Sequence, residues 1–193
     1  MKDTLFVPSF GNRPRTLVGR EDILNRFVAG LDSVSGSRER SMLVLGQRGL
    51  GKTVLLLELA DIASDKGYVV ASPTVASADM TDRILEKLII AGEGYLHTKE
   101  HKVTGGSVSV LGFGAGIQLK ENSNEHKSFA ARLSELCTRI NNAGHPVLIL
   151  VDEVQANHEE LRKLVVAYQE LIGMGIDIAI VLKTMFSLKK KNL

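Results

Sequence analysis

The sequence predicts an α/β fold with a mainly parallel sheet, arranged as a three-layer sandwich with helices on both faces. Short apolar runs alternate along the chain with stretches of helical periodicity, as in strands joined by crossover helices. The most apolar run, residues 147–151, contains no polar residue, which is typical of a strand buried on both faces of a parallel sheet. With 193 residues, 44% hydrophobic and 24% charged, the chain is long enough for one such core.

Each element of this fold has a local signal in the sequence. Apolar residues spaced three and four apart indicate helices, and short apolar runs bounded by glycine, proline or charge indicate strands. In order, the expected elements are helix 23–31, strand 42–45, helix 54–63, strand 68–71, helix 81–96, helix 130–143, strand 147–151, helix 161–171 and strand 176–182.

One folded core is expected over residues 17–183. An irregular lead-in occupies residues 1–16, and a basic tail occupies residues 184–193. Within the core, glycines separate two alternating polar and apolar stretches over residues 103–120, which predicts a glycine-rich hairpin insertion. This insertion is either a flexible exposed segment, which the pattern favours, or a contact for a partner or for DNA.

The charge of the chain does not support DNA binding. Lysine and arginine number 24 and aspartate and glutamate 22. However, Lys189, Lys190 and Lys191 lie in the tail, and without them 21 basic residues face 22 acidic ones. The body of the chain is therefore neutral, whereas a nucleic-acid-binding surface requires clustered positive charge.

The cysteine count and the N-terminus favour a cytoplasmic protein. Cys137 is the single cysteine, so no intrachain disulfide can form, and its spacing from Leu133 and Ile140 predicts a buried position on a helix. Pro8 interrupts the N-terminus before the apolar stretch of a signal peptide can form. No apolar run approaches the roughly 20 residues of a spanning helix, so no membrane association is expected.

A phosphate-binding loop, or P-loop, is predicted at residues 46–53. The segment fits the pattern G-x-x-x-x-G-K-[ST] and lies between a predicted strand and a predicted helix. Its glycines allow backbone N–H groups to turn toward anionic oxygens, Lys52 would neutralise the β and γ phosphates, and the Thr53 hydroxyl would ligate Mg²⁺. The expected nucleotide contacts are Gly46, Gln47, Arg48, Gly49, Leu50, Gly51, Lys52, Thr53 and Val54.

Two acidic residues at the end of the apolar run 147–151 form a Walker B pattern. Asp152 stands at the carboxyl end of the predicted strand, where its carboxylate would hold Mg²⁺ directly or through water. Glu153 would then serve as the general base that polarises a water for attack on the γ phosphorus. By itself such a pair is also a common cap for the next helix, but the P-loop upstream favours the metal and base roles.

The spacing of the two motifs favours ATP over GTP. Lys52 and Asp152 are 100 residues apart, which leaves room for a further strand between the two motif strands. That arrangement is typical of the additional-strand division of P-loop ATPases. The guanine-reading sequence Asn-Lys-x-Asp occurs nowhere in the chain.

Upstream residues resemble the AAA+ and STAND ATPases. The element Leu17-Val-Gly-Arg-Glu-Asp-Ile-Leu-Asn-Arg-Phe27, combined with the P-loop, is similar to their nucleotide-binding module. The likeness is greatest to the branch of bacterial AAA-type ATP-binding proteins and archaeal origin-recognition proteins, and it extends over residues 14–183. It implies that Val18 and Gly19 lie against the adenine. It also implies a sensor 1 residue that assists catalysis near the end of the last strand, for which Thr184 is the first candidate and Ser187 a weaker one.

The C-terminal end departs from a complete AAA+ core. Residues 185–193 resemble neither a fifth strand nor a helical lid, so we expect a core that lacks the lid and is truncated after the sensor 1 strand. Without a fifth strand, one edge of the strand at 42–45 would be open to other chains. Arg139 and Arg162 are candidate arginines for the site of a neighbouring subunit.

Three functions follow from these patterns as alternatives. The first is an AAA+-type module that binds ATP and hydrolyses it with Mg²⁺ to drive conformational change in attached domains or partners. The second is a truncated nucleotide-binding module without significant turnover, and the third is a DNA-handling ATPase of the initiator or loader type. The expected ligands are ATP, ADP and Mg²⁺, and the expected partners are further copies of this chain or another protein.

Overall fold

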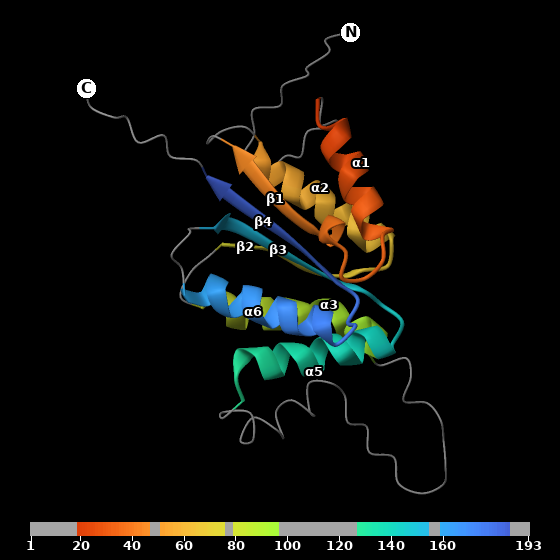
Figure 1. The fold of residues 1–193 in the computed structure, drawn as a ribbon, viewed down its shortest axis with the longest axis vertical. Coiled ribbons are helices and arrows are strands. Elements are labelled where there is room, and N and C mark those ends of the chain that lie inside the picture. The colour runs from red at the N-terminus through yellow and green to blue at the C-terminus, as the bar shows by residue number, and fades with distance from the viewer. Residues whose placement is uncertain (1–18, 47–50, 76–78, 97–126, 155–158, 186–193) are drawn as a thin grey trace, which may run out of the picture.

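A computed structural model describes residues 19–46, 51–75, 79–96, 127–154 and 159–185 of the chain. Within these residues the strands form one four-stranded sheet in the order β1-β4-β3-β2, and each neighbouring pair is parallel (Figure 1). The strands are β1 (Ser41–Gly46), β2 (Val69–Val75), β3 (Val147–Val154) and β4 (Ile178–Met185). The α/β class with a parallel sheet is confirmed.

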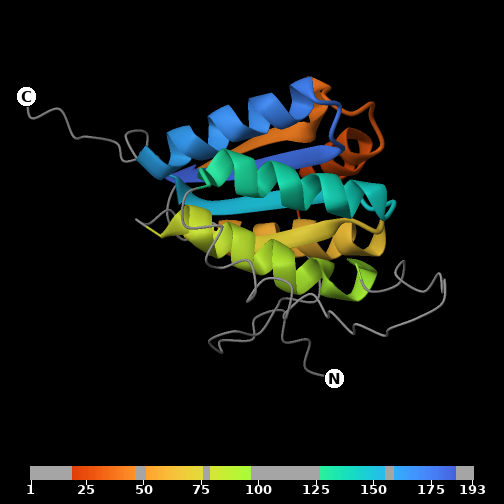
Figure 2. The same ribbon diagram turned by 90° about the horizontal axis from the view of Figure 1, so that it is seen from below.

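Helices cover both faces of the sheet. One face carries α1 (Glu21–Leu31) and α2 (Lys52–Asp65), and the other carries α3 (Met80–Leu96), α5 (Phe129–Asn142) and α6 (Glu159–Gly173) (Figure 1, Figure 2). The buried apolar residues divide in the same way into two clusters, one beneath each helical layer. The described residues are therefore a three-layer sandwich, as the alternating pattern predicts. A short 3₁₀ helix, Arg38–Arg40, leads into β1.

Strand β3 lies inside the sheet because its side chains are apolar on both faces. Residues 147–151 are all 0% exposed. Val147, Ile149 and Val151 belong to the core beneath α3, α5 and α6, whereas Leu148 and Leu150 belong to the core beneath α1 and α2. Alternate residues of a strand point to opposite faces, so an uninterrupted apolar run fits only a strand covered on both sides.

Strand β4 extends farther than its apolar run predicts. The apolar residues suggest 176–182, but the strand runs through Met185. Its backbone continues to pair with both neighbouring strands. Met185 pairs with Gly46 of β1, and Thr184 pairs with Val154 of β3. Residues 184 and 185 therefore belong to the sheet and not to a tail. The sheet does have an additional strand between the two motif strands, because β4 lies between β1 and β3. This strand follows both motifs in the sequence, whereas the strand within the 100 residues between the motifs is β2, which pairs with the other side of β3.

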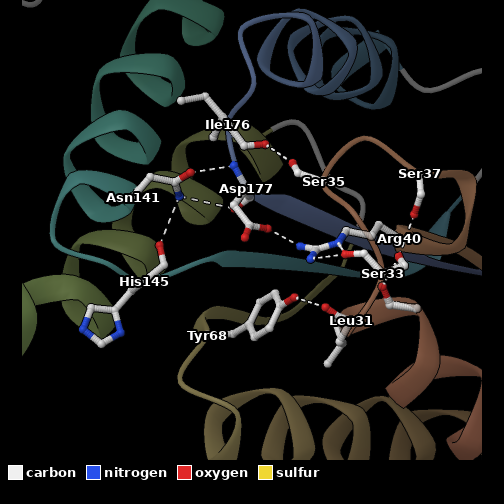
Figure 3. A network of polar contacts seen from close by, with 11 residues as sticks. Leu31, Ser33, Ser35, Ser37, Arg40, Tyr68, Asn141, His145, Ile176 and Asp177 are labelled. Carbon is white, nitrogen blue, oxygen red and sulfur yellow. Dashed lines mark hydrogen bonds and ion pairs between the residues drawn. The ribbon is translucent and has the colours of Figure 1, made fainter.

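A polar network ties the amino-terminal ends of the strands to the loops around them (Figure 3). The Arg40 guanidinium is buried, pairs with Asp177 and donates from Nε to the Ser33 carbonyl at 3.0 Å. Asn141 bridges two loops by donating to the carbonyls of His145 at 3.1 Å and Asp177 at 3.3 Å. This network lies at the end of the sheet opposite the two sequence motifs and serves to fix the loops.

Two further expectations concern the surface of the sheet and the single cysteine. In the described sheet β1 is an edge strand, and on one face of it Leu43 is 56% and Leu45 is 50% exposed. Cys137 is buried in α5, as its spacing predicts, and burial raises the pKa of its thiol to about 12. No helix in the described part of the chain is long and apolar enough to cross a bilayer.

Other predictions fall outside the described residues. These are the lead-in at 1–16, the glycine-rich hairpin at 103–120 and the tail beyond Met185.

Candidate functional site

The candidate site lies where β1, β4 and β3 end side by side. Parallel strands bring their carboxyl ends to one edge of the sheet, and ligands of open α/β sheets bind outside that edge. Strand β1 ends at Gly46 and α2 begins at Lys52. Asp152 lies toward the end of β3, and Lys183 lies toward the end of β4, which pairs with both β1 and β3. The edge thus brings together side chains that are far apart in the sequence.

The first turn of α2 is suited to an anion. Gly51 precedes the helix with φ 68°, a left-handed conformation that L side chains rarely adopt. A Cβ there would meet no atom within 4 Å, so the backbone conformation and not the available space requires glycine. The first turn contains no acidic residue, and the N-cap residue, Gly51, has no side chain that could cap its N–H groups. These N–H groups and the helix dipole attract negative charge. Lys52, a residue only 5% exposed, adds a positive charge at the same place.

Thr53, Asp152 and Lys183 meet at this edge and contact one another. The Thr53 hydroxyl donates to Asp152 Oδ2 at 3.2 Å, although the two residues are 99 positions apart in the sequence. Lys183 Nζ donates to Thr53 Oγ1 at 3.0 Å and forms an ion pair with Asp152 Oδ1. We refer to these three side chains as the Thr53–Asp152–Lys183 cluster.

Burial strengthens the electrostatic interactions between the charged groups of this cluster. Lys183 is 4% exposed and Asp152 is 7% exposed, whereas Thr53 is an exposed residue. No donor among the described residues hydrogen bonds to Asp152 Oδ1, so the ion pair with Lys183 balances the charge of that buried oxygen. A charge buried to this degree is costly unless it is paired. The cluster therefore holds a cation beside a carboxylate and a hydroxyl, next to the start of α2.

The described part of the chain contains some of the predicted site residues and not others. The structure brings Thr53 together with Asp152, and it places Gly46, Gly51, Lys52 and Val54 at the junction of β1 and α2. Thr184 pairs along the sheet with Leu45 and Val154. For Glu153 the structure describes only its place in β3. Gly19 has φ 76°, and its N–H donates to Glu21 Oε1 at 3.3 Å. The remaining predicted contacts, Val18, Gln47, Arg48, Gly49 and Leu50, lie outside the described residues.

Lys183 is the site residue that the sequence did not reveal. It precedes Thr184, the predicted sensor 1 position, and it follows five apolar residues of β4. A lysine at the end of a buried strand is the signal that could have identified it, because such a charge needs a partner nearby. The sequence does not say which partner, since that depends on the order of the strands.

The family of the chain follows from comparison with known proteins. A family model described as the AAA ATPase domain matches residues 16–181. The chain belongs to the AAA ATPase domain family. The match covers β1, β2, β3 and the part of β4 up to Val181, and it includes both sequence motifs. Neither the curated proteins nor the solved structures gave a match.

Membership of this family implies a module that binds ATP, usually with Mg²⁺, and in general hydrolyses it. The AAA ATPase domain of this chain offers suitable ligands for such an ion. Mg²⁺ prefers oxygen ligands and commonly takes one or two protein groups alongside phosphate oxygens and water. Thr53 Oγ1 and Asp152 Oδ2 lie 3.2 Å apart and have this chemistry. The two oxygens are therefore chemically suited to Mg²⁺. Lys183 contacts both of these side chains.

Proposed function

We propose that this AAA ATPase domain binds ATP at the carboxyl edge of β1, β4 and β3 and hydrolyses it with Mg²⁺. The observation that supports this most is the contact between Thr53, from the first turn of α2, and Asp152, from the end of β3. Two sequence motifs 99 positions apart meet there, beside a buried lysine and a helix start that attracts anions. Chance glycine turns and chance helix caps do not account for that meeting.

The residues of the first motif would bind the phosphates. Backbone N–H groups of residues 46–51 and of the first turn of α2 would donate to phosphate oxygens, and Lys52 would neutralise the β and γ phosphates. Thr53 and Asp152 would hold Mg²⁺, which supplies charge neutralisation between the two phosphates when bound. Val54 continues the helix behind these groups.

The remaining assignments concern the reaction and the base. Glu153 would accept a proton from the attacking water, because it follows the metal-binding carboxylate directly in β3. Thr184 would act as the sensor 1 residue near the end of β4. Val18 and Gly19 would contact the adenine, in line with the likeness to the branch that includes archaeal origin-recognition proteins. The energy of hydrolysis would drive conformational change in attached domains or in a partner, including further copies of this chain.

The test is steady-state phosphate release from Mg-ATP over a range of protein concentrations, with Glu153→Gln as the blank. We expect release by the wild type above that of the blank, together with unchanged ATP affinity in Glu153→Gln. A rate per molecule that rises with concentration would show that neighbouring copies complete the site. Release equal to the blank at every concentration would refute hydrolysis by this chain.

A second candidate function is nucleotide binding without significant turnover. It is favoured by one observation: Lys183 already pairs with Asp152, the carboxylate that hydrolysis requires for Mg²⁺. The same phosphate-release assay separates the two candidates, because binding alone predicts tight ATP binding and no release above the Glu153→Gln blank.

A further inference from the structure

A buried ammonium occupies the centre of the proposed site. Strand β4 lies between β1 and β3, so the side chain of Lys183 reaches both the start of α2 and the end of β3. Its Nζ lies 3.0 Å from Thr53 Oγ1 and pairs with Asp152 Oδ1. These are the two side chains that the proposed function assigns to Mg²⁺. An internal cation therefore already bridges the groups that would hold the metal ion.

An ammonium and Mg²⁺ compete at these two side chains, because Lys183 contacts Thr53 Oγ1 and Asp152 Oδ1 and leaves only Asp152 Oδ2 for the ion. A protonated lysine has three donors and no lone pair, so it cannot act as a metal ligand. Two cations that contact the same carboxylate lie within a few ångströms of each other, and their repulsion is large where water is scarce. At 4% exposure, Lys183 is poorly screened by solvent. Mg²⁺ at Asp152 is therefore opposed by the repulsion of the neighbouring ammonium.

The same ammonium lies where it can neutralise part of the phosphate charge of a nucleotide that carries no metal ion. ATP without Mg²⁺ brings more negative charge to the site than Mg-ATP does. Lys183 contacts Thr53, the residue after Lys52, so it lies beside the helix turn proposed to bind the phosphates. A second lysine at that turn would offset part of the charge that Mg²⁺ otherwise neutralises.

We propose that Lys183 is an internal cation that stands in for Mg²⁺ between Thr53 and Asp152, so that this chain binds metal-free nucleotide and gains little affinity from Mg²⁺. The proposal rests on the proposed nucleotide site but goes beyond it. Removing the charge of Lys183 should make ATP affinity depend on Mg²⁺, because Asp152 then lacks its internal cation partner and the phosphates lose a positive neighbour.

The first test measures binding of ATP in EDTA and in Mg²⁺ by calorimetry. The variants are Lys183→Met, which lacks charge and donor, and Lys183→Gln, whose neutral amide keeps a hydrogen-bond donor at this position and protects against a failure to fold. Lys66→Met is the matched control, since Lys66 also pairs with an aspartate, Asp32 at 2.7 Å, but at the far end of α2. We expect Mg²⁺ to tighten ATP binding about tenfold or more in the Lys183 variants and only slightly in the wild type and the control.

The second test uses MgCl₂ alone, without nucleotide, and follows thermal unfolding. Mg²⁺ should raise the melting temperature of Lys183→Met and Lys183→Gln, because the ion replaces the lost ammonium at Asp152, and should leave the wild type and Lys66→Met unchanged. A variant in which Asp152→Asn accompanies Lys183→Met should lose this response, since the carboxylate is gone.

The outcomes separate the two proposals. An equal gain from Mg²⁺ in wild type and Lys183 variants, or no thermal response to Mg²⁺ in the variants, would overturn the role of Lys183 while leaving nucleotide binding in place. Absence of ATP binding by the wild type in both buffers would overturn the nucleotide site, and the role of Lys183 with it.

Discussion

Removing the ammonium of Lys183 should destabilise the nucleotide-free protein, and removing the charge of Asp152 as well should restore part of that loss. In Lys183→Met, an unbranched apolar side chain replaces the lysine. The Asp152 carboxylate, 7% exposed, then loses the cation that balances it. In the double variant with Asp152→Asn neither charge is present, so no uncompensated group remains.

The structure sets the size of each effect. Breaking a buried ion pair by removing one partner costs about 3–5 kcal/mol, and Thr53 still donates to Asp152 Oδ2, so we expect about 3 kcal/mol for Lys183→Met. Asp152→Asn should cost about 1.5 kcal/mol, because Lys183 keeps its hydrogen bond to Thr53. The double variant should also lose about 1.5 kcal/mol, which makes the coupling between the two side chains about 3 kcal/mol.

Urea unfolding in EDTA, followed by far-ultraviolet circular dichroism, measures these free energies. The chain has no tryptophan, so the backbone signal is the appropriate probe, and linear extrapolation to zero urea gives each free energy. The exposed pair of Lys66 with Asp32 provides the control, and Lys66→Met should cost less than about 1 kcal/mol. Additive losses in the double variant, with a coupling below about 0.5 kcal/mol, would refute the ion pair as a determinant of the site.

Three further predictions concern the rest of the molecule. Arg40→Met should lower the free energy of unfolding by about 3 kcal/mol in urea titrations, because the buried Arg40 guanidinium contacts Asp177 and the Ser33 carbonyl. As the control, Arg38→Met should change it by less than about 0.5 kcal/mol, because the Arg38 side chain is 95% exposed. Burial raises the pKa of Tyr68 to about 12 from 10.0, so the stability that its neutral phenol contributes is complete below pH 10 and is lost as the pH rises toward 12. Tyr68→Phe should flatten that decline by up to about 2 kcal/mol, and an unchanged decline would contradict the assignment. Leu43→Lys should weaken self-association about tenfold in sedimentation velocity, because Leu43 is 56% exposed on the edge strand β1, and equal association would show that this edge is not the contact.

Local patterns in the sequence were sufficient for the layered fold. The apolar run 147–151 predicts a doubly buried strand because a strand covered on one face would alternate polar and apolar residues, and all five residues are 0% exposed. The P-loop pattern and the Asp152 carboxylate predict a common site, and the structure brings Thr53 and Asp152 into contact. In both cases the deciding signal lies within a few adjacent residues.

Other features depend on which strands become neighbours. Lys183 meets Thr53 from 130 residues away because β4 inserts between β1 and β3, and no local pattern specifies that order. The pairing of Arg40 with Asp177, 137 residues apart, has the same origin. Strand β4 also extends beyond its apolar residues, since backbone pairing with two neighbours continues where side-chain hydrophobicity stops.

The most direct test of the nucleotide site is the dissociation constant for ATP, measured by calorimetry for the wild type, Lys52→Ala and Lys66→Ala. Lys52 and Lys66 mark opposite ends of α2, so the two substitutions remove the same charge near the site and far from it. We predict that the wild type and Lys66→Ala bind ATP alike and that Lys52→Ala binds about a hundredfold more weakly, or about 2.7 kcal/mol. Equal ATP affinity in Lys52→Ala and the wild type, or no ATP binding by the wild type, would contradict a phosphate site at the start of α2.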